Sequence, residues 1–332
     1  MPNHQNNQPN TPSRRTARFW LFFPFTALLL AAGVYYLIWI YLADSVEKEL
    51  RSAGLNYEST TRGGFPTRIG LIFQSPQYAD THIQWASDLL QIDLMPYNQQ
   101  KAVVRLDGTH DISLKNGRLA ITHEGNIASA RADLNGLSKL DLVLTRPVFD
   151  GKLGRVNINA ATLGSEIHIL RAGEGADHAK LSITNKGLRI GSKTALDRAD
   201  ILAHFPTTWL EQPTQWAQDL NNGSTINIVE GIFAMNDLLF KVTGQLGADQ
   251  NKTLNGKLNL EVNDLKEFVK LLGDLGVITK RESKDLQILS GVTRLFRSTR
   301  SNDQPIKIKL TFKNGKTYLE HIDIGAAPKL PI

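Results

Sequence analysis

The chain has 332 residues, no cysteine and a formal net charge of +6. Without cysteine it has no disulfide, no thiol nucleophile and no thiolate metal site. Half of the excess charge comes from Arg14, Arg15 and Arg18, and no dense Lys/Arg stripe with interleaved aromatic residues follows, which argues against nucleic-acid binding.

The first 18 residues are polar and rich in amides, and their composition predicts a disordered tail. Residues 19–42 then form an apolar run without a charged side chain. Because about 20 such residues cross the hydrocarbon core as a helix, this run predicts one membrane span.

Charge predicts the orientation of this span. The arginines precede it, whereas the other flank begins Ala43-Asp44, so the tail is expected in the cytoplasm and the rest of the chain is expected to be exported. A cleaved signal peptide is the alternative, but its apolar core would be shorter, and the small residues Ala31-Ala32-Gly33 lie inside the run. We therefore expect an uncleaved, single-pass signal anchor over residues 19–42, continued by a juxtamembrane helix over residues 43–54.

From residue 55 to residue 332 the sequence has the pattern of short strands and tight turns. Segments such as KLDLVLTRP, KLNLEVND and IKIKLTFKNG place apolar residues at every second position, as in a strand with one buried face. Pairs of Asp or Asn with Gly favour hairpin turns; they are Asp107-Gly108, Asn116-Gly117, Asn135-Gly136, Asp150-Gly151, Asn222-Gly223, Asn255-Gly256 and Asn314-Gly315. The predicted fold is mainly β (α+β), an extended, curved antiparallel sheet or sandwich with a few covering helices.

Helical spacing of apolar residues predicts three helices in this region: Thr207 to Leu220, Asn263 to Gly276 with Asn263 as the cap, and Thr279 to Phe296. The segment from Asp197 to Thr214 is less regular and contains Pro206, so it is the candidate boundary if the exported region has two domains. One long sheet that runs through it fits the same pattern.

A short motif near the start of the exported region is Gly63, Gly64, Phe65, Pro66, Arg68 and Ile69. The glycines allow a sharp or bulged entry to a strand, and Pro66 cannot donate to a ladder there. We expect a structural corner, with Phe65 closing one end of the core and Arg68 facing outward or pairing with a carboxylate.

This motif after a membrane anchor, and the closing stretch IKIKLTFKNGKTYLEHIDIGAAPKL, resemble domain of unknown function 2125, a family of bacterial envelope proteins. The resemblance implies this architecture and a location in the bacterial inner membrane, with the N-terminus in the cytoplasm and the main domain in the periplasm, but it implies no activity. More distantly, an anchor followed by β structure resembles AsmA-type envelope proteins, whose curved sheets are associated with lipid transport.

A search for catalytic and cofactor motifs is negative. No two histidines have the spacing that places two metal ligands on one helical face, and no nucleophile elbow or complete phosphate loop is present. We expect no enzyme activity, no cofactor and no metal. Convergence of His110 and His168 with a carboxylate would favour an enzyme instead.

Two non-catalytic functions follow from these patterns. In the first, the exported domain is a structural or interaction module that holds envelope protein partners through sheet edges or surface patches. In the second, a β-groove binds or transfers lipid or another hydrophobic ligand, because ligand sites in β folds are commonly apolar. The first is the expected function and the second its alternative.

Overall fold

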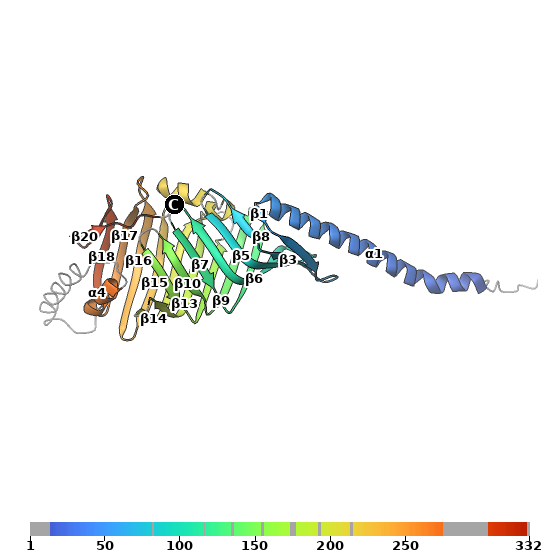
Figure 1. Cartoon of the computed structure of the whole chain (residues 1–332), viewed down its shortest axis with the longest axis horizontal. Coiled ribbons are helices and arrows are strands. Elements are labelled where there is room, and N and C mark those ends of the chain that lie inside the picture. Colours follow the sequence, from blue (N-terminus) through green and yellow to red (C-terminus); the bar gives the residue numbers. More distant parts are fainter. Residues whose placement is uncertain are drawn as a thin grey trace, which may run out of the picture.

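The protein is one long antiparallel β-sheet with a helix projecting from one end, as a computed structural model shows (Figure 1). The structure describes residues 14–274 and 305–330, apart from residues 82, 116, 134–135, 154–155, 173–176, 192–193 and 213–214. The predicted mainly β fold with an antiparallel sheet and few helices is confirmed.

The helices are α1 (Arg14–Ser52), α2 (Thr208–Glu211), α3 (Trp216–Asn221) and α4 (Leu265–Asp274). The first ten strands are β1 (Leu55–Asn56), β2 (Ser59–Gly63), β3 (Ile69–Gln74), β4 (Gln77–Ala79), β5 (Ile83–Met95), β6 (Asn98–Leu114), β7 (Gly117–Thr122), β8 (Gly125–Asp133), β9 (Gly136–Thr145) and β10 (Val148–Leu153). The others are β11 (Val156–Ala161), β12 (Gly164–Arg171), β13 (His178–Ile190), β14 (Thr194–Pro206), β15 (Ile226–Met235), β16 (Leu238–Ala248), β17 (Leu254–Val262), β18 (Ile306–Lys313), β19 (Lys316–Leu319) and β20 (Ile322–Ala326).

Between the long strands β6 and β13 the sheet divides into two sets of shorter strands. The first part of β6 pairs with β8, which leads through β9 and β12 to the first part of β13. The second part of β6 pairs with β7, which leads through β10 and β11 to the end of β13. From β13 to β20 each strand pairs with the next, so one sheet runs through residues 197–206.

Three of the Asp-Gly and Asn-Gly pairs lie inside strands instead of turns: Asp107-Gly108 in β6, Asp150-Gly151 in β10 and Asn255-Gly256 in β17. The last two are places of close backbone approach. A Cβ atom on Gly151 would lie 2.2 Å from the carbonyl oxygen of Arg118, and one on Gly256 would lie 2.1 Å from that of Gln245. Glycine is needed there for space rather than for a turn.

The helix predictions hold in part. The region 207–220 forms two short helices rather than one, with Pro213 between them in the sequence, where a proline removes a helical hydrogen bond. Helix α4 is present, but Asp264 caps it by accepting hydrogen bonds from the N–H groups of Lys266 (2.9 Å) and Glu267 (3.2 Å). Asn263 instead accepts a hydrogen bond from the N–H group of Leu239. The predicted helix at 279–296 lies outside the described residues.

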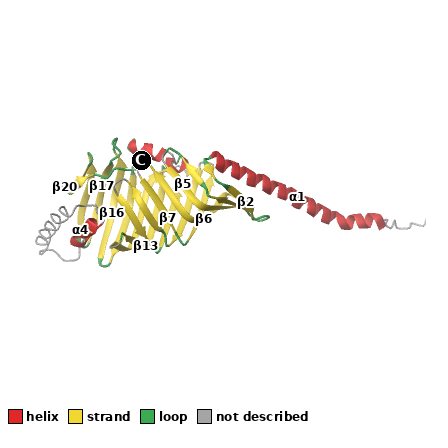
Figure 2. Cartoon of the chain, in the orientation of Figure 1, coloured by secondary structure: helices red, strands yellow, loops and turns green. Residues whose placement is uncertain are grey.

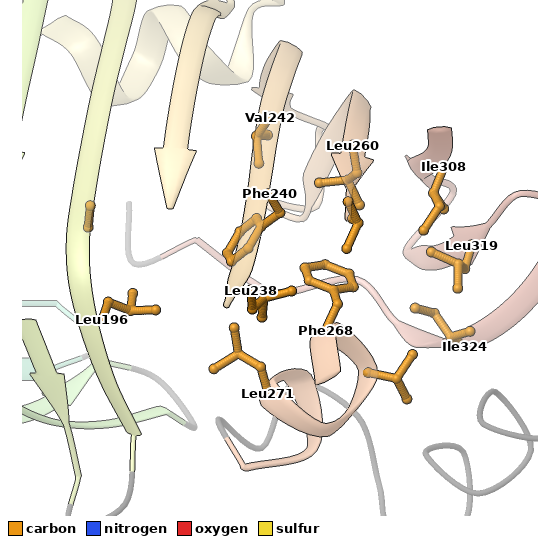
Figure 3. Packing of buried hydrophobic residues seen from close by; sticks show 13 residues of the cluster. Leu196, Leu238, Phe240, Val242, Leu260, Phe268, Leu271, Ile308, Leu319 and Ile324 are labelled. Atoms are coloured by element: carbon orange, nitrogen blue, oxygen red, sulfur yellow. The ribbon is translucent and has the colours of Figure 1, made fainter. Parts of the chain in front are cut away.

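Two clusters of buried apolar residues lie at opposite ends of the sheet. The proximal cluster joins α1 to strands β1, β3 and β5; it comprises Trp39, Ala43, Leu55, Ile69, Leu71, Phe73, Leu90 and Ile92. The distal cluster joins α4 to strands β14 to β20, with Phe240, Leu260 and Phe268 among its members (Figure 3). Figure 2 shows α1 and α4 at the two ends of the molecule.

Candidate functional site

Helix α1 projects from the sheet, and its C-terminal part also packs against the sheet. Among the described residues, Phe25–Ser52 is the one helical stretch long and apolar enough to cross a membrane. Its large apolar side chains, such as Leu29 and Leu37, are exposed, whereas Trp39 and Ala43 are buried against the sheet. One face of the helix therefore completes the proximal cluster.

The loop after β2 contacts this same helix. The ring of Phe65 packs edge-on against Tyr36 and Trp39, with ring centroids 5.2 and 5.9 Å apart, and the Phe65 side chain remains 44% exposed. Phe65 thus contacts α1 and does not close the core of the sheet, contrary to the expectation from the sequence.

The other residues of the motif surround this contact. Gly63 ends β2, and Gly64 has a positive φ of 89°. The Phe65-Pro66 peptide bond is cis. Arg68 lies 3.6 Å from the carboxylate of Asp93, as expected for a carboxylate pair, and Ile69 is buried at the start of β3.

The sheet carries an unbroken row of apolar residues from the proximal cluster to the distal cluster. Directly opposed residues of antiparallel strands point to the same face, so the strand register defines this row. The first apolar row has twelve members: Leu71, Ile92, Val104, Ala128, Leu142, Ile167, Ile183, Ile201, Gly231, Val242, Leu260 and Ile308. At about 4.8 Å between neighbouring strands, it is roughly 50 Å long.

A second apolar row runs beside the first on the same face. It comprises Ile69, Leu94, Ala102, Ala130, Leu140, Ile169, Leu181, Ala203, Ile228, Gly244, Leu258, Leu310 and Leu319. The opposite face is mostly polar, as the row Asp93, Val103, Ser129, Asp141, His168, Ser182, Leu202 and Glu230 shows. The two faces of the sheet therefore differ in polarity over most of its length.

Burial along the rows is uneven. Leu71 and Ile92 are buried in the proximal cluster, and Val242 and Leu260 are buried at the distal end. Between them, the side chains of Leu142, Ile167, Ile183 and Ile201 are only partly buried. The middle of the apolar face is thus more accessible than an ordinary core.

At the distal end both rows enter a cavity of about 560 Å³. The first row contributes Ile201, Val242 and Leu260 to its lining, and the second row contributes Leu258 and Leu310. Helix α4 closes over these strands with Phe268 and Leu271, as Figure 3 shows. This volume lies in the range of sites for small apolar ligands.

Two clusters of polar groups in the described part of the chain contain a histidine close to another polar side chain. On the polar face, the Nδ1 atom of His168 lies 2.8 Å from Asp141, and Ser129 donates its hydrogen bond to Asp141 rather than to His168. Burial raises the pKa of Asp141, but hydrogen bonds from Lys139 and His168 outweigh it and hold this pKa below its ordinary value. Because the serine contacts the carboxylate, the histidine does not activate it as a base would.

His110 lies in a different cluster. Its Nε2 atom is 2.7 Å from Nε2 of His123, which also lies 2.8 Å from the side-chain amide of Asn126. His110 and His168 therefore have separate partners. No group of three or more His, Cys, Asp or Glu residues that could hold a metal ion occurs among the described residues.

The family model that matches this chain is described as an uncharacterized protein conserved in bacteria, domain of unknown function 2125, and it covers residues 43–328. The chain belongs to this family. No curated protein and no solved structure matches it. The resemblance inferred from the motif is thereby confirmed for this domain of unknown function 2125 protein, and the matched region begins at Ala43, the helix residue that is fully buried against the sheet.

The sequence alone did not predict the apolar rows, which depend on how the strands align. Each strand displays the alternation that contributes one or two members, such as Leu140 and Leu142 in KLDLVL. The register between strands, which joins these members into a row, is set by turns and bulges and is not visible in any single segment.

Proposed function

We propose that this domain of unknown function 2125 protein is anchored in the bacterial inner membrane and binds the acyl chains of lipids along its apolar rows, in the periplasm and without catalysis. The observation that carries the proposal is the unbroken apolar face between a candidate membrane span and the distal cavity.

The packing of α1 supports an uncleaved anchor. Trp39 and Ala43 are 6% and 0% exposed against the sheet, so cleavage after the apolar run would expose the proximal cluster. At about 25 cal/mol per Å² of apolar surface, losing the burial of one large side chain such as Trp39 costs several kcal/mol. A helix that completes the folded domain is expected to stay attached to it.

The partial exposure of the middle rows supports binding of an apolar ligand. A purely structural sheet would gain stability by covering Leu142, Ile167 and Ile183, since each of these partly buried side chains forgoes part of the about 1.5–3 kcal/mol that full burial contributes. An acyl chain laid along the rows would cover these side chains without demanding any specific hydrogen bond. The distant resemblance to AsmA-type proteins agrees with this proposal.

The interaction module expected from the sequence does not require such a row. A scaffold that holds partners through its edges needs exposed strands or patches, and its two faces need not differ over many strands. We therefore prefer the lipid-binding alternative to the protein-binding module for this chain.

Site-specific photocrosslinking tests the proposal. The full-length protein carries p-benzoylphenylalanine at Leu142, in the first apolar row, or at Val143, the next residue, which points to the polar face and is 41% exposed. Irradiation in cells, purification and mass spectrometry of the labelled peptides would then reveal a lipid adduct. We expect adducts at Leu142 and none at Val143.

Comparison of the crosslinker at Leu142 with the crosslinker at Val143 distinguishes lipid bound along the apolar row from unspecific contact. Adducts at equal levels at both positions would indicate unspecific contact with membrane lipid and would overturn the proposal, as would protein adducts alone at Leu142. Leu142→Glu should lower the amount of lipid that co-purifies with the full chain, whereas Val143→Glu should leave this amount unchanged.

A further inference from the structure

The loop Gly64–Arg68, which we name the tip loop, lies beside the last turns of the apolar run of α1. Phe65 contacts Tyr35, Tyr36 and Trp39, with ring centroids between 5.2 and 5.9 Å apart. All three partners precede Leu42, the last residue of the run. At about 1.5 Å per residue, Tyr35 lies roughly 10 Å back from that end.

We infer that the tip loop is a second membrane-inserted element, with Phe65 at the boundary between head groups and acyl chains of the periplasmic leaflet. The inference rests on the proposed membrane anchoring by α1. If the apolar run spans the bilayer, a loop packed against Tyr35 and Trp39 must share their depth, and Tyr and Trp residues favour this interfacial layer.

Several backbone polar groups of the tip loop have partners that suit that environment. Irregular backbone at membrane depth requires partners for its N–H and C=O groups, because lipid supplies none. The hydroxyl of Tyr35 donates to the carbonyl oxygen of Pro66 at 2.6 Å, and the indole N–H of Trp39 donates to that of Arg68 at 2.8 Å. The carbonyl oxygen of Gly64 accepts from the N–H groups of Thr67 and Arg68, and Pro66 has no N–H group.

A second exposed turn lies at the same end of the sheet. Strand β5 ends at Met95, and its residue Leu94 pairs with Ile69, the residue that follows the tip loop. In this turn Met95 is 37% exposed and Tyr97 is 82% exposed. An apolar and an amphipathic side chain at this position extend the surface that would face the bilayer.

The position of the tip loop has a consequence for the proposed lipid binding. Ile69 is the first member of the second apolar row, and it follows Arg68 directly. A loop inserted into the leaflet would therefore place the start of the apolar face at the level of the acyl chains. A chain could then pass from the bilayer to the protein without crossing water.

Depth measurements on single-cysteine variants test the inference, since the chain has no cysteine of its own. The full-length protein is reconstituted in vesicles of phosphatidylethanolamine and phosphatidylglycerol, and an NBD fluorophore is attached at Phe65→Cys or Thr67→Cys. A nitroxide on a shallow acyl-chain carbon of the lipid serves as quencher. Leu163→Cys, in the β11–β12 connection and 68% exposed, is the control for an exposed apolar site on the sheet.

We expect the lipid-borne nitroxide to quench the labels at 65 and 67 at least threefold more than the label at 163. Equal quenching at 65, 67 and 163 would overturn the inference. A label at Leu29→Cys, in the middle of the apolar run and read with a nitroxide on a deep acyl-chain carbon, separates the two proposals. Quenching at 29 without quenching at 65 and 67 refutes insertion of the tip loop, whereas its absence at 29 refutes the anchor on which the inference rests.

Discussion

At Gly64 the backbone conformation and the surrounding atoms both demand glycine. Its φ of 89° lies in a region that other residues rarely adopt, and a Cβ atom there would lie 2.8 Å from the carbonyl oxygen of Arg68. That same turn presents the tip loop to α1. Gly64 is thus constrained by its conformation and surroundings, whereas a Cβ atom at Gly63 would meet no atom within 4 Å.

Replacing Gly64 with alanine should therefore destabilise the protein by about 1–3 kcal/mol, since backbone strain of this kind has that magnitude. Thermal unfolding of the full chain in detergent measures the change, and we expect a midpoint lowered by several degrees. Gly63→Ala is the matched control, because no atom lies within 4 Å of a Cβ atom at Gly63. Equal midpoints for the two variants would contradict the assignment.

His110 makes stability depend on pH. Burial and the neighbouring His123 lower the pKa of His110 below its ordinary value, and Asp88 and Asp107 oppose this shift. Below pH about 6.5 the unfolded chain binds a proton that the folded protein does not. As the pH falls below this value, the free energy of unfolding therefore decreases by at most about 1.4 kcal/mol per pH unit. Above that pH this contribution vanishes.

Unfolding of the full chain at pH 7.5 and pH 5.5 checks this sign. We expect the wild-type protein to lose more stability on acidification than His110→Gln, because glutamine does not titrate. If both proteins lose the same amount, His110 does not carry the pH dependence.

Among the helices and strands, the sequence predicts whether a segment is helical or extended better than it predicts where the element begins and ends. The alternation in IKIKLTFKNG predicts β18 and its turn, where Asn314 and Gly315 both have positive φ. The same dipeptide chemistry fails at Gly151 and Gly256, because crowding by a neighbouring strand, which no local pattern encodes, determines those glycines.

The candidate site likewise has parts that the sequence predicts and parts that it does not predict. The motif around Phe65 and the apolar run were recognisable from composition and order. The contact between Phe65 and Trp39 was not, because it joins a strand tip to a helix across a distance that only the folded sheet defines. The apolar rows likewise depend on the register of many strand pairs.

At the scale of the whole molecule, the charge asymmetry of α1 predicts an exported sheet. A reporter that is active only outside the cytoplasm, fused after Ile332, should therefore give signal, and the same reporter fused before Arg14 should not. Loss of periplasmic signal on replacing Arg14, Arg15 and Arg18 with glutamate would agree with the charge rule. Activity of the N-terminal fusion alone would reverse the orientation.

The order of strand pairing has a consequence for how the protein forms. Each pairing among the described strands joins strands at most three apart in chain order. Contacts that are this local in sequence favour rapid folding and need no distant part of the chain. In the proposed topology, α1, β3 and β5 can assemble first as the chain emerges from the membrane, and each later strand can pair with the edge of the strands already formed. The proposed topology therefore has the sheet grow outward from the bilayer during synthesis, with the distal end and α4 as the last part to form.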